Sequence, residues 1–217
     1  MARHLPDGRP NDPSDARFRL TEAARQVIAQ LASSAASSDS FEAARDLVEQ
    51  AAAVLAASEH GRRYDHAEGS MSAITDSFDY SPFVGALNPL APPITVTIEG
   101  DVLVGNVVYG DAYEGPPGCV HGGFIAAGFD DILGFAQSMA NRPGMTGRLE
   151  VSYRSPTPLH RPLRYEGRID RIEGRKIFTL ATLCHGETLC AEAMGLFIST
   201  DASVFQRLMQ ARAQPGG

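Results

Sequence analysis

Apolar residues near the start of the chain recur at helical spacing in two separate stretches. A Ser- and Ala-rich break at 33–38 divides them. Ser14 or Asp15 can cap the first stretch, and Asp39 with Glu42 resembles a capping box for the second. The apolar positions are Leu20, Ala24, Val27, Ile28 and Leu31 in the first stretch, and Ala44, Leu47, Val48, Ala51, Val54 and Leu55 in the second. The pattern therefore predicts a helical hairpin.

The chain between residues 60 and 77 shows no such period. Gly61 is the expected end of the second helix, because glycine commonly follows a helix C-terminus. The residues after it are polar, which is typical of a linker. We therefore expect residues 1–77 to form an N-terminal helical extension and a linker to the main domain.

The pattern then changes to the alternation that is typical of strands. Ile94, Val96 and Ile98 alternate with Thr95, Thr97 and Glu99. A turn at Gly100 and Asp101 can lead into a returning strand at 102–109, which predicts a β-hairpin. After a Gly- and Pro-rich loop at 110–118, a helix is expected from about 122 to 140. Its apolar face comprises Ile125, Phe129, Ile132 and Ala136.

Four further strands are expected after this helix. Their predicted ranges are 149–154, 163–172, 177–184 and 188–198. An antiparallel sheet needs a cover for its apolar face, and the long helix between the second and third strands is the local candidate. We therefore predict an α+β fold at 78–200 in which the sheet wraps around one central helix, followed by a short helix and tail at 201–217.

Composition narrows the class of protein. The 217 residues include 43% apolar ones, enough to bury a sizeable core, and the net charge of -7 argues against a nucleic-acid binder. Three cysteines are too few for a disulfide scaffold and suggest a reducing compartment. The sequence shows no apolar run of the roughly 20 residues that span a bilayer, and residues 1–15 lack the apolar core of a signal peptide. A cytoplasmic location is therefore expected.

One flank of the predicted central helix combines small residues with a carboxylate. At about 100° per residue this flank comprises Gly123, Ala126, Ala127, Asp130 and Gly134. Small residues leave room for a ligand or a partner helix to approach. Apolar surroundings would make Asp130 a usable base, whereas Asp131 points to the other side and is expected to be solvated or salt-bridged.

The segment His121-Gly122-Gly123 lies where this helix begins. The first turn of a helix leaves backbone N–H groups unpaired, with a partial positive charge, and glycine exposes them. A carbonyl group placed there would be polarised as its oxygen gains charge, as in an oxyanion hole. The sequence thus offers an electrophile-activating turn and, two helical turns later, a candidate base.

Together these residues resemble a known family. The pattern G-x-x-H-G-G-x-x-x-x-x-x-D is present as Gly118, His121, Gly122, Gly123 and Asp130. Thr146, the segment 151–156, Pro158, the turn 173–176 and the closing strand 191–198 also look like the later strands of that family. Over about residues 78–200 the chain resembles hotdog-fold acyl-CoA thioesterases of the phenylacetate-pathway (PaaI-like) type and mammalian-type thioesterase superfamily members.

The resemblance implies a mechanism. Asp130 would act as general base or nucleophile against a thioester carbonyl, and Gly122 with Gly123 would donate backbone N–H groups to its oxygen. Thr146 would help to position the water, and His121 would organise the loop and bond near the carbonyl. In such proteins the site forms between two subunits, so the resemblance implies a homodimer or a dimer of dimers.

A basic region could bind coenzyme A. Between residues 142 and 176 there are nine arginine or lysine residues and four acidic ones, and guanidinium groups match phosphate oxygens well. The candidates are Arg154, His160, Arg161, Arg164, Arg175 and Lys176. Coenzyme A would enter as part of the substrate, and no separate cofactor, metal or nucleic acid is expected.

Other chemistries are less well supported by the sequence. G-x-S-x-G, P-loop and H-E-x-x-H motifs are absent from it. Cys184, His185 and Cys190 do not have the spacing of a standard zinc site, and the glycine turn explains the surroundings of Cys119 better than a thiol nucleophile does. A non-catalytic acyl-CoA-binding hotdog domain remains an alternative, and a hydroxyacyl-CoA dehydratase of the same fold is a third.

Overall fold

A computed structural model describes residues 15–58, 77–92, 94–140, 142 and 144–200, together with five residues nearer the C-terminus. Those five, 203, 204, 207, 210 and 211, are helical, within the region where a short helix was predicted. Gly61 and most of the predicted linker lie outside the described residues. In the part of the chain that the structure describes, no helix is both long and apolar enough to cross a membrane.

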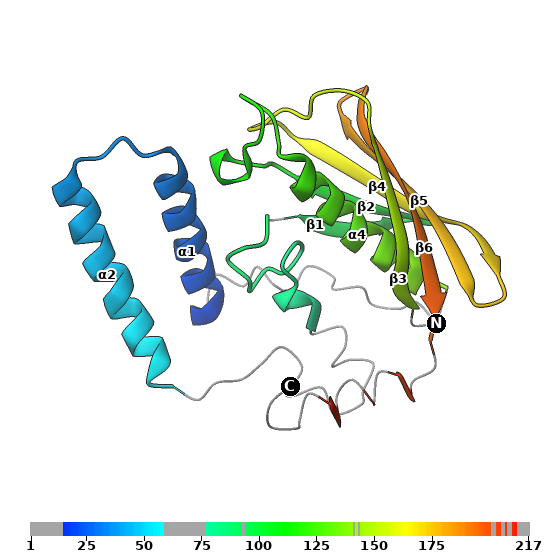
Figure 1. Cartoon of the computed structure of the whole chain (residues 1–217), viewed down its shortest axis with the longest axis horizontal. Coiled ribbons are helices and arrows are strands. Elements are labelled where there is room, and N and C mark those ends of the chain that lie inside the picture. Colours follow the sequence, from blue (N-terminus) through cyan, green and yellow to red (C-terminus); the bar gives the residue numbers. More distant parts are fainter. Residues whose placement is uncertain are drawn as a thin grey trace.

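The N-terminal hairpin consists of α1 (Ala16–Ser33) and α2 (Ser38–Ala56). Asp15 caps α1 as predicted, and its carboxylate accepts the Arg17 N–H at 2.9 Å. The predicted cap of α2 is wrong: the N-cap residue is Ser37, two residues before Asp39, and its hydroxyl accepts the Ser40 N–H. Figure 1 shows the two helices side by side, away from the sheet, with α2 farther out.

Six antiparallel strands form one sheet in the order β1-β2-β4-β5-β6-β3. The strands are β1 (Thr95–Glu99), β2 (Val102–Val107), β3 (Gly144–Tyr153), β4 (Leu163–Glu173), β5 (Lys176–His185) and β6 (Thr188–Ser199). All six were predicted, but β3 begins five residues earlier than expected. A register shift between Thr146 and Arg148 leaves Gly147 as an extra residue, and such a bulge hides the alternation from which strands are read.

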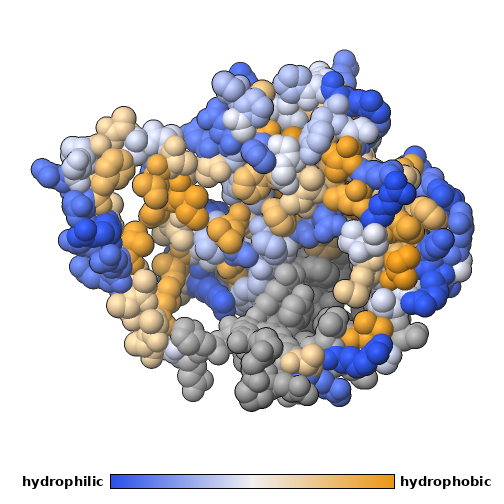
Figure 2. All heavy atoms as spheres, in the orientation of Figure 1, coloured by the Kyte–Doolittle hydropathy of each residue, from blue (hydrophilic) through white to orange (hydrophobic). Residues whose placement is uncertain are grey.

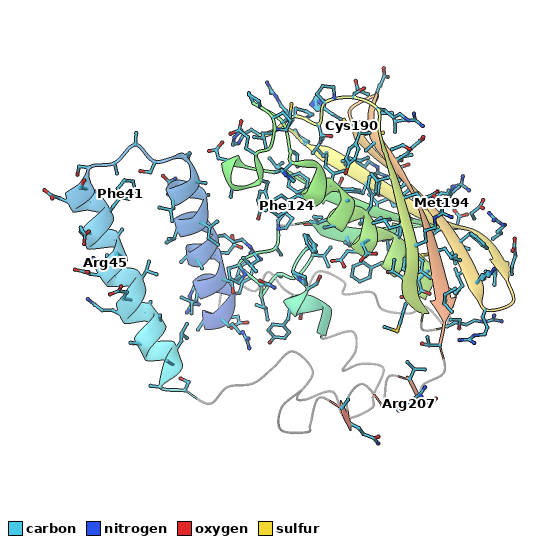
Figure 3. The ribbon with its side chains drawn as sticks, in the orientation of Figure 1. Phe41, Arg45, Phe124, Cys190, Met194 and Arg207 are labelled. Carbon is cyan, nitrogen blue, oxygen red and sulfur yellow. The ribbon has the colours of Figure 1, made fainter. Side chains whose placement is uncertain are left out.

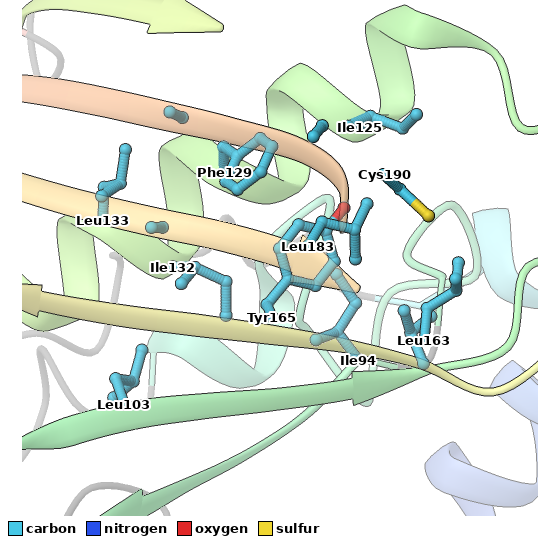
Figure 4. Packing of buried hydrophobic residues seen from close by; sticks show 14 of the residues in the cluster. Ile94, Leu103, Ile125, Phe129, Ile132, Leu133, Leu163, Tyr165, Leu183 and Cys190 are labelled. Atoms are coloured by element: carbon cyan, nitrogen blue, oxygen red, sulfur yellow. The ribbon is translucent and has the colours of Figure 1, made fainter. Parts of the chain in front are cut away.

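Helix α4 (Gly122–Ser138) packs into the curve of the sheet, in contact with β2 to β6. Its predicted apolar face is buried, and Figure 4 shows Ile125, Phe129 and Ile132 among side chains of the strands. Two strand glycines allow this close approach. A Cβ atom on Gly105 or Gly167 would lie 2.6 Å or 2.8 Å from methyl groups of Ile132. A sheet wrapped around one central helix is the predicted hotdog arrangement.

One segment connects the hairpin to the domain. After the short helix η1 (Ser77–Tyr80), Ser81 donates a hydrogen bond of 2.7 Å to Asp131, so Asp131 is held by the protein rather than simply solvated. Farther on, the Arg25 guanidinium of α1 donates to the carbonyl oxygens of Gly85, Ala86, Asn88 and Ala91. In Figure 3 side chains of α1 and of this segment meet between the two parts.

Candidate active site

The glycine turn at the start of α4 is held from three sides. His121 is the N-cap residue, and its Nδ1 accepts the Gly123 N–H at 3.0 Å. Its backbone N–H donates to the carbonyl oxygen of Tyr113, which belongs to η2 (Asp111–Tyr113). The Tyr153 hydroxyl of β3 donates to the Gly122 carbonyl oxygen at 2.7 Å. The turn is therefore positioned by β3 and by the loop before α4.

These bonds distinguish the two glycines that were expected to donate to a substrate. The Gly123 N–H is already bonded to His121, so Gly122 is the better placed donor for a carbonyl oxygen. A histidine whose Nδ1 accepts a hydrogen bond carries its proton on Nε2 when neutral. His121 is exposed, so Nε2–H is a second donor available beside the turn.

Asp130 and Thr146 lie together, although α4 and β3 come from different parts of the chain. The Thr146 hydroxyl donates a hydrogen bond of 3.0 Å to a carboxylate oxygen of Asp130. The bulge at Gly147 comes directly after Thr146, and bulges commonly redirect side chains beside functional sites. Asp130 is half-buried, and the small residues Ala126, Ala127 and Gly134 of the same flank are also only partly covered.

The glycine turn and the carboxylate are too far apart to act on one carbonyl group within a single chain. Gly122 and Asp130 are separated by eight residues of one helix. At a rise of 1.5 Å per residue they lie about 12 Å apart along the axis. A reacting carbonyl must lie about 3 Å from its oxyanion donors and close to the base or its water. A single α4 cannot provide both.

Strand β3 forms an open edge of the sheet on the same side as Asp130. Among the described strands its one neighbour is β6, so its other edge is not paired with any of them. Met145 and Tyr153 are each about half exposed, at 52% and 53%. An unpaired edge can pair with a second strand, and a strand from another copy of the chain is the simplest candidate.

The predicted phosphate-binding residues fall into two groups. Arg154, His160 and Arg161 lie in or beside the 155–162 loop, which contacts the glycine loop through hydrogen bonds such as Leu159 N–H to the Gly118 carbonyl. Arg175 and Lys176 lie at the turn between β4 and β5, at the other end of these strands. The sixth candidate, Arg164, lies in β4 and forms ion pairs with Glu99 and Glu166. The structure therefore does not bring all six together.

Two residues of the first group already have partners. Arg154 Nε donates to Glu192 at 3.0 Å. His160 Nε2 lies 2.6 Å from Asp111 Oδ1, and this bond holds the pKa of the Asp111 carboxyl below its ordinary value of 3.8. In the second group, Arg175 Nε donates to the Ser199 carbonyl oxygen. All of these side chains are exposed enough to exchange partners with a ligand.

Four supporting residues were missed by the sequence prediction. Tyr153 and Glu114 hold the glycine loop, Glu114 by accepting the Gly118 N–H at 2.7 Å. The Tyr165 hydroxyl lies 2.9 Å from that of Tyr109 behind Gly128 of α4, and burial raises the pKa of both groups, so both stay protonated. Tyr153 falls within the family-like segment 151–156, which was the one available signal.

One buried group of α4 has no partner. Gln137 is 3% exposed, and its Oε1 accepts no hydrogen bond from any residue that the structure describes. Its amide nitrogen donates to Ser138 at 3.1 Å.

Among the described side chains, His, Cys, Asp and Glu form no cluster of three that could hold a metal ion.

The fold and the site define a class of protein. A solved structure described as a thioesterase superfamily protein is 30% identical to this chain, with a TM-score of 0.74, and the match covers 86% of this chain and 92% of that protein. The chain belongs to the thioesterase superfamily, and its fold is the hotdog fold.

The sequence is also similar to parts of curated proteins. Acyl-coenzyme A thioesterase THEM4 of Xenopus laevis is 37% identical over 91 residues, 41% of each chain. The same-named protein of Mus musculus is 37% identical over 90 residues, 41% of this chain and 39% of the relative. The chain thus spans about two fifths of the length of these relatives. No family model matches the sequence. The PaaI-like subtype stays a prediction.

Proposed function

We propose that the protein hydrolyses acyl-CoA thioesters to free acid and coenzyme A as a homodimer, and that it needs no cofactor. The observation that carries the proposal is the hydrogen bond between Thr146 and Asp130 on the open flank of α4. It fixes a carboxylate beside a threonine hydroxyl, at a place that a ligand can reach. The similarity to proteins named acyl-coenzyme A thioesterase supports the substrate class.

In the proposed reaction, a water held near Thr146 adds to the thioester carbonyl carbon while Asp130 accepts its proton. The carbonyl oxygen becomes negatively charged and is stabilised by the Gly122 N–H and by His121 Nε2–H. The C–S bond then breaks, the CoA thiolate leaves and takes up a proton, and the carboxylic acid is released. In the alternative, Asp130 attacks the carbonyl carbon, the CoA thiolate leaves and a mixed anhydride forms, which water then hydrolyses. A single-turnover reaction in ¹⁸O-water detects this route when water attacks the aspartyl carbonyl, because the first product then carries an unlabelled oxygen from the carboxylate and the label enters Asp130.

Two copies of the chain are needed for this geometry. The glycine turn and Asp130 lie about 12 Å apart along one helix. If two α4 helices pack antiparallel about a two-fold axis, the turn of one subunit faces Asp130 of the other. The open edge of β3 and the small residues beside Asp130 supply surfaces for such packing. We therefore assign Asp130 and Thr146 to one subunit of each site, and His121 and Gly122 to the other.

The proposed coenzyme A contacts follow from the same arrangement. Arg154, His160 and Arg161 lie near the glycine turn and are the first candidates for the phosphate groups. Arg175 and Lys176 could reach the same coenzyme A only from the other subunit.

We also propose a cytoplasmic location. It is supported by the small number of cysteines, which suggests a reducing compartment.

The direct test is release of CoA thiol from a panel of acyl-CoA substrates that differ in chain length and aromatic character. Asp130→Asn should lower turnover by at least about 100-fold, the usual loss of a general base. Asp131→Asn is the matched control, since Asp131 bonds to Ser81, and it should stay active. If Asp130→Asn were fully active, Asp130 would not be the base. If the unmodified chain bound acyl-CoA and released no thiol, the non-catalytic alternative would replace the proposal.

The oxyanion donor can be removed almost alone. Gly122 is the first residue of α4, where proline is tolerated because its N–H has no partner within the helix. His121 before it has ψ 131°, as a residue preceding proline requires. Gly122→Pro should therefore fold and lose about 10²- to 10³-fold in turnover. Gly122→Ala keeps the N–H but places a Cβ atom 3.2 Å from the Tyr153 hydroxyl. It therefore controls for this crowding, which the proline variant shares, and should lose less activity than Gly122→Pro.

Mixing the two inactive variants tests whether the site is shared. A hybrid dimer of Asp130→Asn and Gly122→Pro chains has one site with both defects and one site with neither. Random mixing should restore about a quarter of the activity, since half of the dimers are hybrids with one intact site of two. No recovery, with hybrids demonstrated by mass, would place both groups in one chain.

A further inference from the structure

The N-terminal hairpin exposes more apolar surface than its own chain covers. Helix α2 buries none of its residues. Leu47, Val48, Val54 and Leu55 are 67%, 49%, 72% and 54% exposed, and Phe41 is 39% exposed. Monomeric soluble proteins seldom leave a contiguous apolar surface of this extent without a partner.

The apolar residues of α2 follow the repeat of a helix that packs against other helices. Phe41, Val48 and Leu55 are seven residues apart, and Ala44 and Ala51 form a second series with the same spacing. A heptad repeat of this kind keeps one apolar seam facing a partner along the whole helix. Alanine in the seam allows two helix backbones to approach closely.

Helix α1 has a similar exposed stripe. Leu20, Val27 and Leu31 lie on one side of it and are 44%, 46% and 65% exposed. The side that contacts the domain is a different one, because it carries the buried Thr21 and the Arg25 that binds the 85–91 segment. The domain therefore does not use the apolar stripe of α1.

The two stripes form one surface. In Figure 2 the hydrophilic residues of α2 point away from the molecule, and the hydrophobic residues of α1 and α2 lie on the sides that face each other. The exposed fractions show that the two helices do not cover each other, so a groove remains between them. Its walls are the stripe of α1 and the seam of α2.

The charges of α2 argue for an apolar protein partner rather than a charged one. Arg45 forms ion pairs with Glu42, Asp46 and Glu49 of its own helix. With Asp39, α2 carries four acidic residues and one basic residue. Such a helix would be repelled by the anionic surface of a membrane, which attracts lysine and arginine.

A second copy of the chain is the partner that these features fit. It presents the same two stripes, so two hairpins can bury them mutually about a two-fold axis. The eight large apolar side chains of the two stripes are 39–72% exposed. They offer several hundred Å² per copy, of the order of the 800 Å² per partner in a stable interface. Residues 78–200 make up less than three fifths of this chain. The related thioesterase superfamily structure matches 86% of this chain, so the match must include part of the N-terminal extension.

We propose that the apolar stripes of α1 and α2 pack against those of a second copy to form a four-helix bundle. This interface is separate from the β3 edge, because α1 contacts η2 and the 85–91 segment, whereas β3 lies at the far edge of the sheet. The inference goes beyond the proposed function. With both interfaces the chain would assemble as a dimer of dimers, joined through its hairpins.

The test is the mass of the assembly formed by the 217-residue chain, measured by analytical ultracentrifugation. The double variant Leu47→Asp, Val54→Asp should halve the mass of the assembly while turnover per chain stays within about twofold, since no proposed site residue is changed. Ala53→Asp, on the opposite side of α2, is the control and should leave the mass unchanged. An unchanged mass for the double variant would overturn the inference.

A second variant guards against loss of the helix itself. Leu47→Ala, Val54→Ala keeps the helix, because alanine is the best helix former, and removes only apolar area. It should weaken association by at least about tenfold, with circular dichroism unchanged. An undiminished association constant would mean that the groove is not the interface. The proposed thioesterase activity is measured separately by thiol release, so either proposal can fail without the other.

Discussion

Helices α4 and α2 are similar in length and both have one apolar face, yet their surroundings differ completely. Helix α4 has 17 residues and buries eight of them, whereas α2 has 19 and buries none. Five strands cover α4, whereas none of the helices and strands that the structure describes covers α2. Amphipathic spacing thus shows that a helix has an apolar face, but what covers that face depends on the rest of the fold.

The difference between the two helices also explains why the proposed reaction is assigned to α4. One face of α4 is fixed by the sheet, and the adjoining flank with Asp130 is only partly covered. A carboxylate on a rigid helix beside an open flank can be both held in place and reached by a ligand. Helix α2 has no comparable rigid support, so we assign it to association rather than catalysis.

The largest difference in the loss of stability is expected between substitutions of two phenylalanines. Phe129 in α4 is fully buried and Phe41 in α2 is 39% exposed. Phe129→Ala should lower the free energy of unfolding by about 3–5 kcal/mol through the lost burial and the cavity. Phe41→Ala should cost under about 1 kcal/mol in dilute solution. Urea denaturation followed by circular dichroism measures both at a protein concentration low enough to dissociate the proposed bundle. Equal losses there would mean that α2 is buried within its own chain.

A smaller difference in the loss of stability is expected between substitutions of two arginines. Arg25 joins α1 to the domain, with a side chain 12% exposed, whereas Arg45 makes ion pairs on the surface of α2, with a side chain 55% exposed. Arg25→Met should destabilise by about 1.5–3 kcal/mol, since it breaks charge-assisted hydrogen bonds to buried carbonyl groups. Arg45→Met should cost at most about 1 kcal/mol.

Hydrogen exchange shows where the Arg25 effect acts. The amides of α1 should exchange faster in Arg25→Met, while those of α4 keep their protection. Uniform acceleration across the domain would instead mean that hairpin and domain unfold as one unit.

Glutamine 137 offers a change that should stabilise the protein. Its Oε1 is buried without a partner, so Gln137→Met should raise the free energy of unfolding by about 1 kcal/mol. Gln50→Met, at an exposed position of α2, should change it by less than about 0.5 kcal/mol. Thermal melting of both variants gives the comparison. A loss of stability in Gln137→Met would show that the amide binds a water or a ligand in solution.

The smallest expected effect concerns Asp111, on the short helix that α1 contacts. Because its bond with His160 lowers the pKa of Asp111 in the folded state, the carboxylate stabilises the fold above the ordinary value of 3.8. That contribution is lost as the pH falls through the lower folded pKa. Asp111→Asn should therefore melt slightly earlier than the unmodified chain at pH 7, and the difference should vanish in acid. A difference independent of pH would contradict the assignment.

Much of the fold and part of the site could be predicted from the sequence, because the signals are local. The period of 3.6 places both hairpin helices and α4, and alternation places the strands to within a few residues, except at the bulge beside Thr146. The glycine turn and Asp130 belong to one helix, so their spacing follows from the sequence alone.

Only the tertiary structure decided which distant residues meet. The order of strands leaves β3 at the edge, brings Thr146 to Asp130, and places Tyr153 on Gly122. It also separates Arg175 and Lys176 from Arg154, His160 and Arg161, which the sequence had grouped by proximity along the chain. Helix and strand periods reflect bonds between near neighbours, whereas these contacts depend on hydrogen bonds between strands that are far apart in the sequence.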